Sequence, residues 1–280
     1  MPSSSDTQVE IRFGDQQLIF DTALGGRATS WNYQGLELLG AAGEDLVEFG
    51  FYPMLPWAGR LAENCIRVNG ELIEQEINFQ GWAIHGLSFN EPLTSWHVDV
   101  DEDSTTFVAV QEISTWIEDL EVTFTWTIKE HSLDTTIEVK PISEVATRVV
   151  LGWHPWFRKT LGSGSPAELQ IDEAKLLTKA GSLPTGALID FDVILGPFDD
   201  ALIVPSKTVV IEWPRALQLR ITNSHEWFVI YDGNPNLICV EPQTGAPNAL
   251  NGAFSDSVLV CSQSEPARMT TSWELRSLSD

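Results

Sequence analysis

Long hydrophobic runs are absent from this 280-residue chain, and no apolar stretch approaches the roughly 18 residues that a membrane-spanning helix needs. The N-terminal segment, MPSSSDTQVEIRFG, has neither the basic start nor the apolar middle of a secretory signal peptide. We therefore expect neither a membrane span nor a cleaved leader, and we expect a soluble protein of the cytoplasm.

Cysteine and basic residues are also scarce. Cys65, Cys239 and Cys261 are odd in number and lack metal-ligand spacing, which indicates no disulfide framework and fits a reducing compartment. Cys239 lies in an apolar run and is expected to be a small buried hydrophobic residue. Lys and Arg number 16 against 40 Asp and Glu, so the formal net charge is −24. Such a charge repels polyanions, so we expect no nucleic acid and no membrane surface as a partner.

Several local site signatures are missing as well. The chain has no HExxH, no CxxC, no GxxxxGK and no GxSxG, which argues against the zinc, redox, phosphate-binding and serine-hydrolase sites that those patterns mark. Aromatic residues, in contrast, are plentiful, with eleven tryptophans. A tryptophan can pack in a core or lie against the flat apolar face of a ligand such as a sugar ring, and composition favours neither.

The dominant pattern in the chain is an alternation of period two, which predicts β-strands. No convincing helical periodicity exceeds two or three turns, although residues 44–51 are expected to form a short helix. Turn-forming residues separate the predicted strands, and many strands at regular spacing are typical of an antiparallel sandwich or barrel. We expect one all-β domain over residues 1–280. The clearest strand segments are QVEIRFG, QQLIFD, FVAVQEI, EVTFTWTIKE, DTTIEVKPI, TVVIEW, ALQLRIT and SVLVCSQ.

Two apolar runs each end in an ionisable residue that proline follows, at RVVLGW-His154-Pro155 and NLICV-Glu241-Pro242. The residue before proline is held in extended geometry, and proline does not continue a central strand. Each run thus predicts a buried strand that stops after delivering one proton-transferring side chain. Partial desolvation raises the pKa of a glutamate and suits it to general-base work, and imidazole exchanges protons near neutral pH. We interpret His154 and Glu241 as an acid/base pair that works in one pocket.

Three further residues are candidates for ligand contacts. His85 precedes Gly86, where a backbone and a ligand can approach closely. Arg60 is either a surface residue or a fork-shaped donor to ligand hydroxyls, and Asp199 is either a turn residue or a hydroxyl acceptor.

A metal held by His85, His154 and Glu241 is a chemical alternative, because two histidines and a carboxylate can bind zinc or iron. The three lie far apart in the sequence without a local ligand motif, so we expect no metal and no cofactor. The other histidines, at positions 97, 131 and 225, are expected on the surface or in strands.

Five segments that interrupt the alternation resemble, in the same order, segments of the aldose 1-epimerase (galactose mutarotase) family. They are PMLPWAGR at 53–60, AIHG at 83–86, HPWF at 154–157, LPTG at 183–186 followed by FDDAL, and EPQT at 241–244. No one of them is decisive, but five in order along most of the chain are strong together. The resemblance implies a large antiparallel β-sandwich of the galactose mutarotase type that interconverts the α and β anomers of a free aldose without a cofactor.

The resemblance also implies a role for each candidate residue. Glu241 would be the general base that removes the proton of the anomeric hydroxyl, and His154 the general acid that protonates the ring oxygen. The hydroxyls of the sugar would be held by His85, Arg60 and Asp199, with the adjacent Asp200 as the alternative to Asp199.

Departures from the family pattern leave two alternatives open. Leu87 stands where the family has a second glycine and Trp156 where it has tyrosine, and either could reshape a sugar subsite. Arg158 and Lys159 could meet a phosphate, as in related epimerases that act on glucose 6-phosphate, but the motifs of those enzymes match this chain less well. A non-catalytic sugar-binding protein is the other alternative, and the presence of both an acid and a base argues against it.

Overall fold

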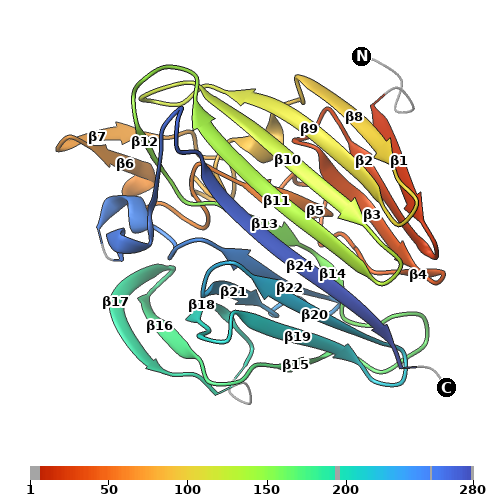
Figure 1. The fold of residues 1–280 in the computed structure, drawn as a ribbon. Helices are drawn as coiled ribbons and strands as arrows, with labels where there is room; N and C mark the ends of the chain where they lie inside the picture. Colours follow the sequence, from red (N-terminus) through yellow and green to blue (C-terminus); the bar gives the residue numbers. More distant parts are fainter. Residues whose placement is uncertain (1–6, 193–195, 253, 279–280) are drawn as a thin grey trace.

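Two large antiparallel sheets make up most of the structure, a computed structural model that describes residues 7–192, 196–252 and 254–278 (Figure 1). The larger sheet has twelve strands, of which β14 (Phe157–Arg158) and β4 (Leu36–Glu37) lie off the main path. In spatial order, the path comprises β1 (Gln8–Phe13), β2 (Gln16–Asp21), β3 (Arg27–Tyr33), β5 (Phe51–Met54), β13 (Gly152–Pro155), β22 (Leu237–Gln243), β21 (Trp227–Tyr231), β18 (Asp199–Ile203), β16 (Lys175–Ala180) and β17 (Leu183–Asp190).

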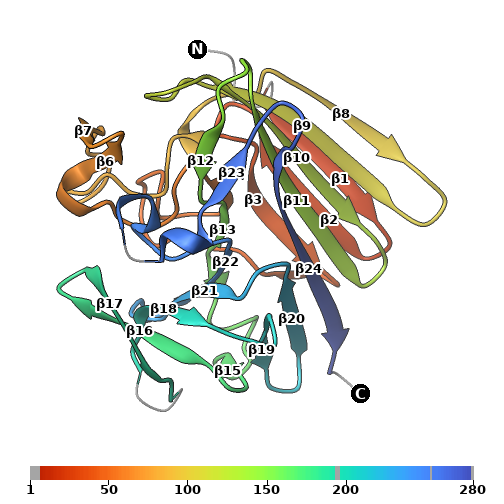
Figure 2. The ribbon, with the colours of Figure 1, turned by 60° about the vertical axis from the view of Figure 1, so that its left-hand side comes forward.

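The second sheet has eight strands and stacks on part of the first (Figure 2). In spatial order it contains β15 (Glu168–Gln170), β19 (Thr208–Trp213), β20 (Leu217–Asn223), β24 (Ala267–Ser277), β11 (Ser132–Pro141), β10 (Leu120–Ile128), β9 (Thr105–Ile113) and β8 (Ser95–Val100). Two small ribbons complete the strands, β6 (Cys65–Val68) with β7 (Glu71–Glu74) and β12 (Thr147–Val149) with β23 (Leu259–Cys261).

Helical structure is confined to short 3₁₀ turns in the described part of the chain. They are η1 (Ala62–Asn64), η2 (Ser88–Asn90), η4 (Ala249–Asn251) and η5 (Ser255–Ser257). None of the described helices is long and apolar enough to cross a membrane. The N-terminal segment from which we expect no leader lies partly outside the described residues.

The main core lies between the two sheets and follows from the alternation of each strand. In β10 every second residue is buried, and Trp126 is one of these. Its ring lies 4.7 Å from the rings of both Phe51 and Trp153, which come from the larger sheet. Such aromatic contacts bury large apolar surfaces and fix how the sheets pack. The all-β antiparallel sandwich predicted from the sequence is confirmed.

The same alternation sends every second side chain of the larger sheet to its other face. Trp153 and Val240 belong to the core between the sheets, so their neighbours His154 and Glu241 point away from it. A second buried cluster, which includes Tyr52, covers that outer face and is built largely from loops between strands. The outer face of the larger sheet therefore presents the two predicted proton-transfer residues.

The expectation of a short helix over residues 44–51 is wrong. These residues form turns and bends, and β5 begins at Phe51. The carbonyl of Val47, which a helix would use internally, accepts hydrogen bonds from the Tyr52 hydroxyl and the Trp156 indole, both at 2.9 Å. Long-range contacts thus override the local preference.

The expectation that Glu241 ends its strand is also wrong. β22 continues through Pro242 to Gln243, and Pro242 keeps its register opposite Phe228 of β21. On the other side of β22, β13 meets it at the single register pair of Gly152 and Gln243. Proline has no N–H to donate. Because the ladder between β22 and β13 is so short, the lack of an N–H at Pro242 on that side costs few hydrogen bonds, and the proline is tolerated within the strand.

Candidate active site

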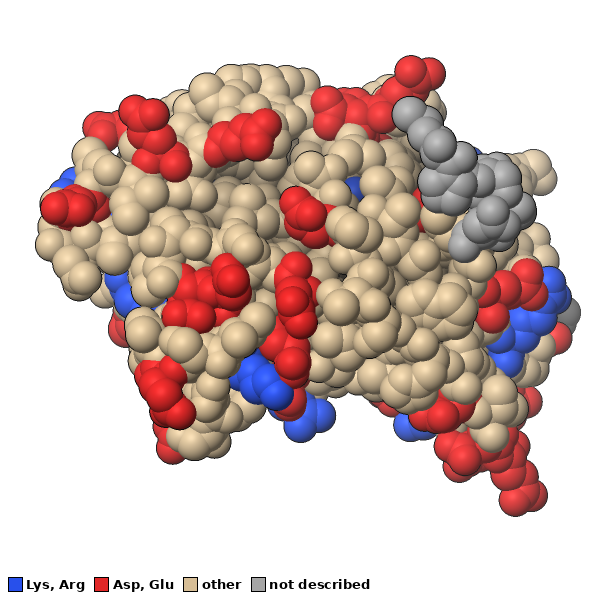
Figure 3. All heavy atoms as spheres, turned by 90° about the horizontal axis from the view of Figure 1, so that it is seen from above, with Lys and Arg blue, Asp and Glu red and all other residues tan. Residues whose placement is uncertain are grey.

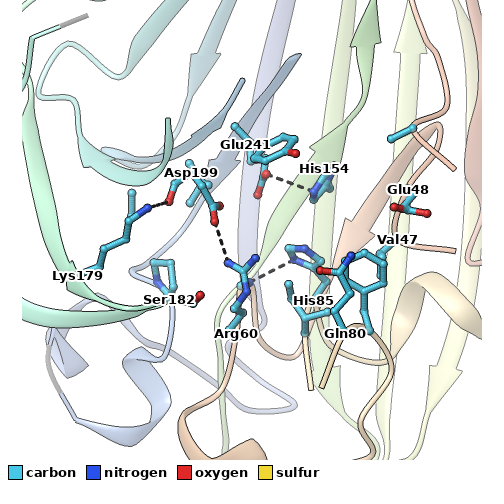
Figure 4. A pocket seen from close by; sticks show the side chains of 18 of the residues that line it. Val47, Glu48, Arg60, Gln80, His85, His154, Lys179, Ser182, Asp199 and Glu241 are labelled. Carbon is cyan, nitrogen blue, oxygen red and sulfur yellow. Dashed lines mark hydrogen bonds and ion pairs between the residues drawn. The ribbon is translucent and has the colours of Figure 1, made fainter. Parts of the chain in front are cut away.

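A cavity of about 290 Å³ opens on the outer face of the larger sheet (Figure 4). Its wall combines β13, β22, β18 and the β16–β17 hairpin with loops from the N-terminal third of the chain. The volume is near the lower end for small-molecule pockets, which suits a ligand the size of one sugar ring. All five residues singled out from the sequence line it: Arg60, His85, His154, Asp199 and Glu241.

His154 and Glu241 face each other directly, from adjacent strands. The Nε2 of His154 lies 3.2 Å from Oε1 of Glu241, and the residues are 4% and 3% exposed. The imidazole stacks on the Tyr52 ring with centroids 4.7 Å apart and planes 11° apart, and Trp156 lies 5.2 Å away. Aromatic rings therefore hold the imidazole in place, and the carboxylate faces its Nε2.

Burial shifts both groups of this pair toward their uncharged forms. Desolvation raises the pKa of Glu241 well above its usual value, and the charge of Asp199 acts in the same direction, while Arg60 and Gln243 oppose it. Desolvation also lowers the pKa of His154 to about 3, with Arg27 contributing. Because each shift disfavours charge, the pair is favoured with one proton between its two members and no net charge.

The raised pKa of Glu241 predicts a pH-dependent stability difference between the wild type and Glu241→Gln. Above pH 4.5 the carboxyl ionises in the unfolded chain while the folded state keeps its proton, so wild-type stability falls as the pH rises toward the folded-state pKa. The loss is limited to about 1.4 kcal/mol per pH unit. Glutamine has no carboxyl group to ionise. Between pH 5 and 8, the free energy of unfolding of Glu241→Gln, measured in urea, should therefore rise relative to that of the wild type. A stability difference independent of pH would contradict this.

His85 is held so that it offers a hydrogen-bond donor. It adopts φ +62°, and its Nδ1 accepts the backbone N–H of Gly59 at 3.4 Å. Burial lowers the pKa of His85 well below its usual value, helped by His154 and Arg60, so the ring is neutral and its proton sits on Nε2. Gly86 packs closely against the backbone of Leu55 and does not line the cavity.

Arg60 and Asp199 form a second polar group on the wall. Arg60 Nη1 lies 3.4 Å from Asp199 Oδ2, and Figure 4 shows the guanidinium between Asp199 and His85. Of the two adjacent aspartates, Asp199 lines the cavity, whereas Asp200 pairs with Lys179 at 2.9 Å. The alternation of β18 accounts for the difference, because consecutive residues point to opposite faces.

Two wall residues, Glu48 and Lys179, and one residue behind the wall, Tyr52, escaped the sequence reasoning. Glu48 lies in the segment that was expected to be a helix, and no hydrogen bond or ion pair of its carboxylate occurs within the described residues. Lys179 lies on β16, which carried no motif, although the LPTG segment lies on β17 of the same hairpin. Tyr52 could have been found, because it directly precedes Pro53, the first residue of PMLPWAGR, and strand alternation turns its side chain to the face opposite Phe51 and Pro53.

The set of residues that could bind a metal differs from the His85, His154 and Glu241 considered from the sequence. Among the described residues, the cluster with ligand geometry consists of His154, Cys239 and Glu241, whose donor atoms lie within 4.8 Å of one another, and His85 is not part of it. His154 and Glu241 already contact each other there. The thiol of Cys239 is fully buried, and burial raises its pKa well above the usual value, which opposes the thiolate that a metal needs.

The remaining candidates lie outside the cavity. His97, His131 and His225 do not line it, and neither do Leu87, Arg158 or Lys159. All eleven tryptophans lie in the described ranges, and Trp156 is the one on the cavity wall. The acidic excess is spread over the surface, as Figure 3 shows for one face.

One family model matches most of the chain. The family model described as aldose 1-epimerase matches residues 10–260. A search of curated proteins finds no match.

Solved structures show the same fold at low sequence identity. A galactose mutarotase-like protein from Clostridium acetobutylicum is 16% identical, with 96% of this chain and 95% of that chain covered and a TM-score of 0.83. The galactose 1-epimerase of Lactobacillus acidophilus is 12% identical, with 96% and 94% covered and a TM-score of 0.78. An aldose epimerase homologue from C. elegans is 14% identical, with 97% and 99% covered and a TM-score of 0.75. The fold is thus of the galactose mutarotase type.

Proposed function

Because this chain belongs to the aldose 1-epimerase family, we propose that it interconverts the α and β anomers of a free, unphosphorylated aldose by acid/base ring opening and reclosure. The observation that carries the proposal is the contact between His154 Nε2 and Glu241 Oε1, 3.2 Å apart on the wall of a cavity of about 290 Å³.

The spacing of the pair suits this reaction. In a cyclic aldose the anomeric hydroxyl oxygen and the ring oxygen are bonded to the same carbon, so the base and the acid must act at adjacent positions. A contacting pair can do so with small movements. Glycoside hydrolases instead keep two carboxyl groups about 5–9.5 Å apart. The pair therefore favours anomer interconversion over hydrolysis.

The singly protonated pair reacts in the form that has its one proton on His154 and leaves Glu241 ionised, which it reaches by proton transfer across the 3.2 Å contact, and it ends with that one proton on Glu241. Glu241 takes the proton of the anomeric hydroxyl as the bond between the anomeric carbon and the ring oxygen breaks and a carbonyl forms. His154 delivers a proton to the ring oxygen. Rotation about the bond beside the aldehyde, followed by the reverse steps, gives the other anomer. General acid/base help of this kind is worth roughly 100- to 10,000-fold in rate.

The other polar groups of the wall would orient the ring. Arg60 and the Nε2–H of His85 are donors to sugar oxygens, and Asp199 accepts from a hydroxyl. Arg60 and His85 lie on loop segments, while Asp199 lies on β18 at the edge of the cavity. Donors and an acceptor around one ring are what recognition of a polyhydroxylated ligand requires.

The proposal is tested by NMR or polarimetry of anomer interconversion over a panel of aldoses, with galactose and glucose first. Acceleration of at least one free aldose above the buffer rate is the expected result. Calorimetric binding of a sugar with no acceleration across the panel would favour the non-catalytic alternative. Neither binding nor acceleration would refute both.

Charges on the wall argue against a phosphorylated sugar. Arg60 is paired with Asp199 and Lys179 with Asp200, so the cations of the wall are compensated. Glu48 adds a carboxylate that has no ion-pair partner among the described residues. Two cations that could have met a phosphate, Arg158 and Lys159, lie outside the cavity wall.

We predict that kcat/KM for glucose 6-phosphate is lower than that for glucose by roughly tenfold or more, because a like charge several ångströms away in a half-buried site repels the dianion. NMR exchange measurements on both sugars check this. Glu48→Gln should reduce the difference in kcat/KM between glucose and glucose 6-phosphate. The matched control is Glu44→Gln, because Glu44 is exposed and lies outside the cavity. Equal or better use of the phosphate ester would contradict the prediction.

We infer that the protein works in the reducing environment of the cytoplasm. Its three cysteines are all buried and free. Free buried thiols that form no disulfide gain no stability from an oxidising compartment. We expect all three cysteines to titrate as free thiols in the denatured protein after purification without reductant.

A further inference from the structure

Arg27, at the start of β3, is an unusual buried cation. It is 0% exposed, yet no carboxylate within the described residues forms an ion pair with it. Its guanidinium donates to the carbonyls of Phe49 and Phe89, while its Nε has no partner. Arginine is rarely buried this completely without a counter-charge, so its position calls for an explanation.

The guanidinium lies behind the proposed acid/base pair. It sits 4.3 Å from the centroid of the Phe49 ring and 4.4 Å from that of Tyr52. The Tyr52 ring in turn stacks nearly parallel on the imidazole of His154, 4.7 Å away. A cation, an aromatic ring and the imidazole are thus layered from the interior toward the cavity. Aromatic faces attract cations, so Phe49 and Tyr52 can hold the charge without neutralising it.

We propose that Arg27 is a positioning residue for the acid/base pair: its fixed positive charge, layered behind Tyr52, keeps the pair of His154 and Glu241 from taking up a second proton. This inference rests on the proposed function. A pair with two protons has lost its base, because Glu241 can then accept nothing. A fixed cation nearby opposes every proton that the pair binds, so it extends the active, singly protonated state to lower pH.

The electrostatics of the surroundings agree with this role. Burial lowers the pKa of Arg27 itself to about 10, so it remains charged at neutral pH. Its charge adds to burial in lowering the pKa of His154. Arg60, the cation on the cavity side, is paired with Asp199. The charge of Asp21 acts on Arg27 in the direction opposite to burial. The other charged or titratable groups around the pair and on the cavity wall are Glu48, Tyr52, His85, Lys179, Asp199, Tyr231 and Cys239.

The test compares Arg27→Gln and Arg27→Lys with the wild type in the full chain. The readout is the pH dependence of kcat for anomer interconversion, together with urea unfolding. Loss of the charge in Arg27→Gln should move both limbs of the profile to higher pH, by about one pH unit, because proton uptake by the pair becomes easier. Arg27→Lys keeps the charge, so its limbs should stay close to those of the wild type even if kcat falls.

A purely structural role gives a different result. Arg27→Met fills the same space without a polar group that needs a partner, and it replaces Arg27→Gln if that variant does not fold. An uncharged variant that lowers kcat at every pH with unmoved limbs would overturn the proposal. So would failure of both uncharged variants to fold.

The failure of this inference and that of the proposed function can be told apart. If the wild type accelerates no anomerisation, the proposed function fails, and NMR titration of the His154 ring then tests Arg27 directly. A higher pKa of His154 in Arg27→Gln than in the wild type supports the inference, and an unchanged pKa overturns it.

Discussion

Glu241→Gln is expected to lower kcat for anomer interconversion by about 100- to 10,000-fold. The amide keeps the shape of the side chain but cannot accept the proton of the anomeric hydroxyl. The position is 3% exposed and borders Gln243, whose Nε2 lies 3.2 Å from Glu241 Oε2, so an isosteric replacement can stay in place. Saturation-transfer NMR on the best aldose of the panel measures the exchange rate directly, and KM should change far less than kcat.

His154→Asn should show a loss of similar size, and the double variant should lose little more than either single one. Groups that act as a unit are strongly non-additive, because removing one member already disables the step. The matched controls are Glu44→Gln and His97→Asn, both exposed and outside the cavity. Wild-type kcat in both Glu241→Gln and His154→Asn would rule out the proposed mechanism.

Gly86→Ala is expected to lower the free energy of unfolding by about 3 kcal/mol or more. Gly86 adopts φ +79°, and a Cβ there would lie 1.9 Å from the carbonyl oxygen of Leu55 and 2.3 Å from its carbonyl carbon. Both obstacles are backbone atoms, so no side-chain rotation relieves the contact. The bridge between Leu55 and Gly86 also holds the neighbouring His85, so we expect KM for the sugar to rise as well.

Gly81→Ala is the matched control for Gly86→Ala. It lies in the same loop with φ +86°, but nothing would lie within 4 Å of its Cβ. Only the strain of positive φ remains there, about 1 kcal/mol. Urea unfolding of the two variants thus separates strain from steric overlap. Equal losses in the two would show that the approach of Leu55 to Gly86 is unimportant.

Local patterns in the sequence predicted much of the fold and several members of the site. Strand alternation placed the segments of β1, β2, β9, β10, β11, β19 and β20 correctly, because period two follows directly from a half-buried strand. His154 and Glu241 stood out because an ionisable residue between an apolar run and a proline is unusual. The structure brings the two together, although β22 does not stop at Glu241 as the proline argument requires.

Other features depend on contacts that no local pattern encodes. Whether Asp199 or Asp200 faces the cavity follows from the register of β18 against β21, where Asp199 lies opposite Tyr231. The layering of Arg27 on Tyr52 joins β3 to β5, strands whose pairing was not predictable from their composition. The misplaced helix at residues 44–51 has the same origin, since the backbone there is held by the side chains of Tyr52 and of Trp156, the second of which is distant in sequence.

The carbonyl of Val47, which accepts from both Tyr52 and Trp156, has a consequence for how this site can vary. The two rings that flank His154 are aligned by one main-chain oxygen and not by any side chain of residue 47. Exchanging Val47 for another apolar residue leaves that oxygen in place. Adding or deleting one residue between positions 42 and 50 moves it. The length of this loop should therefore be more constrained in evolution than its composition.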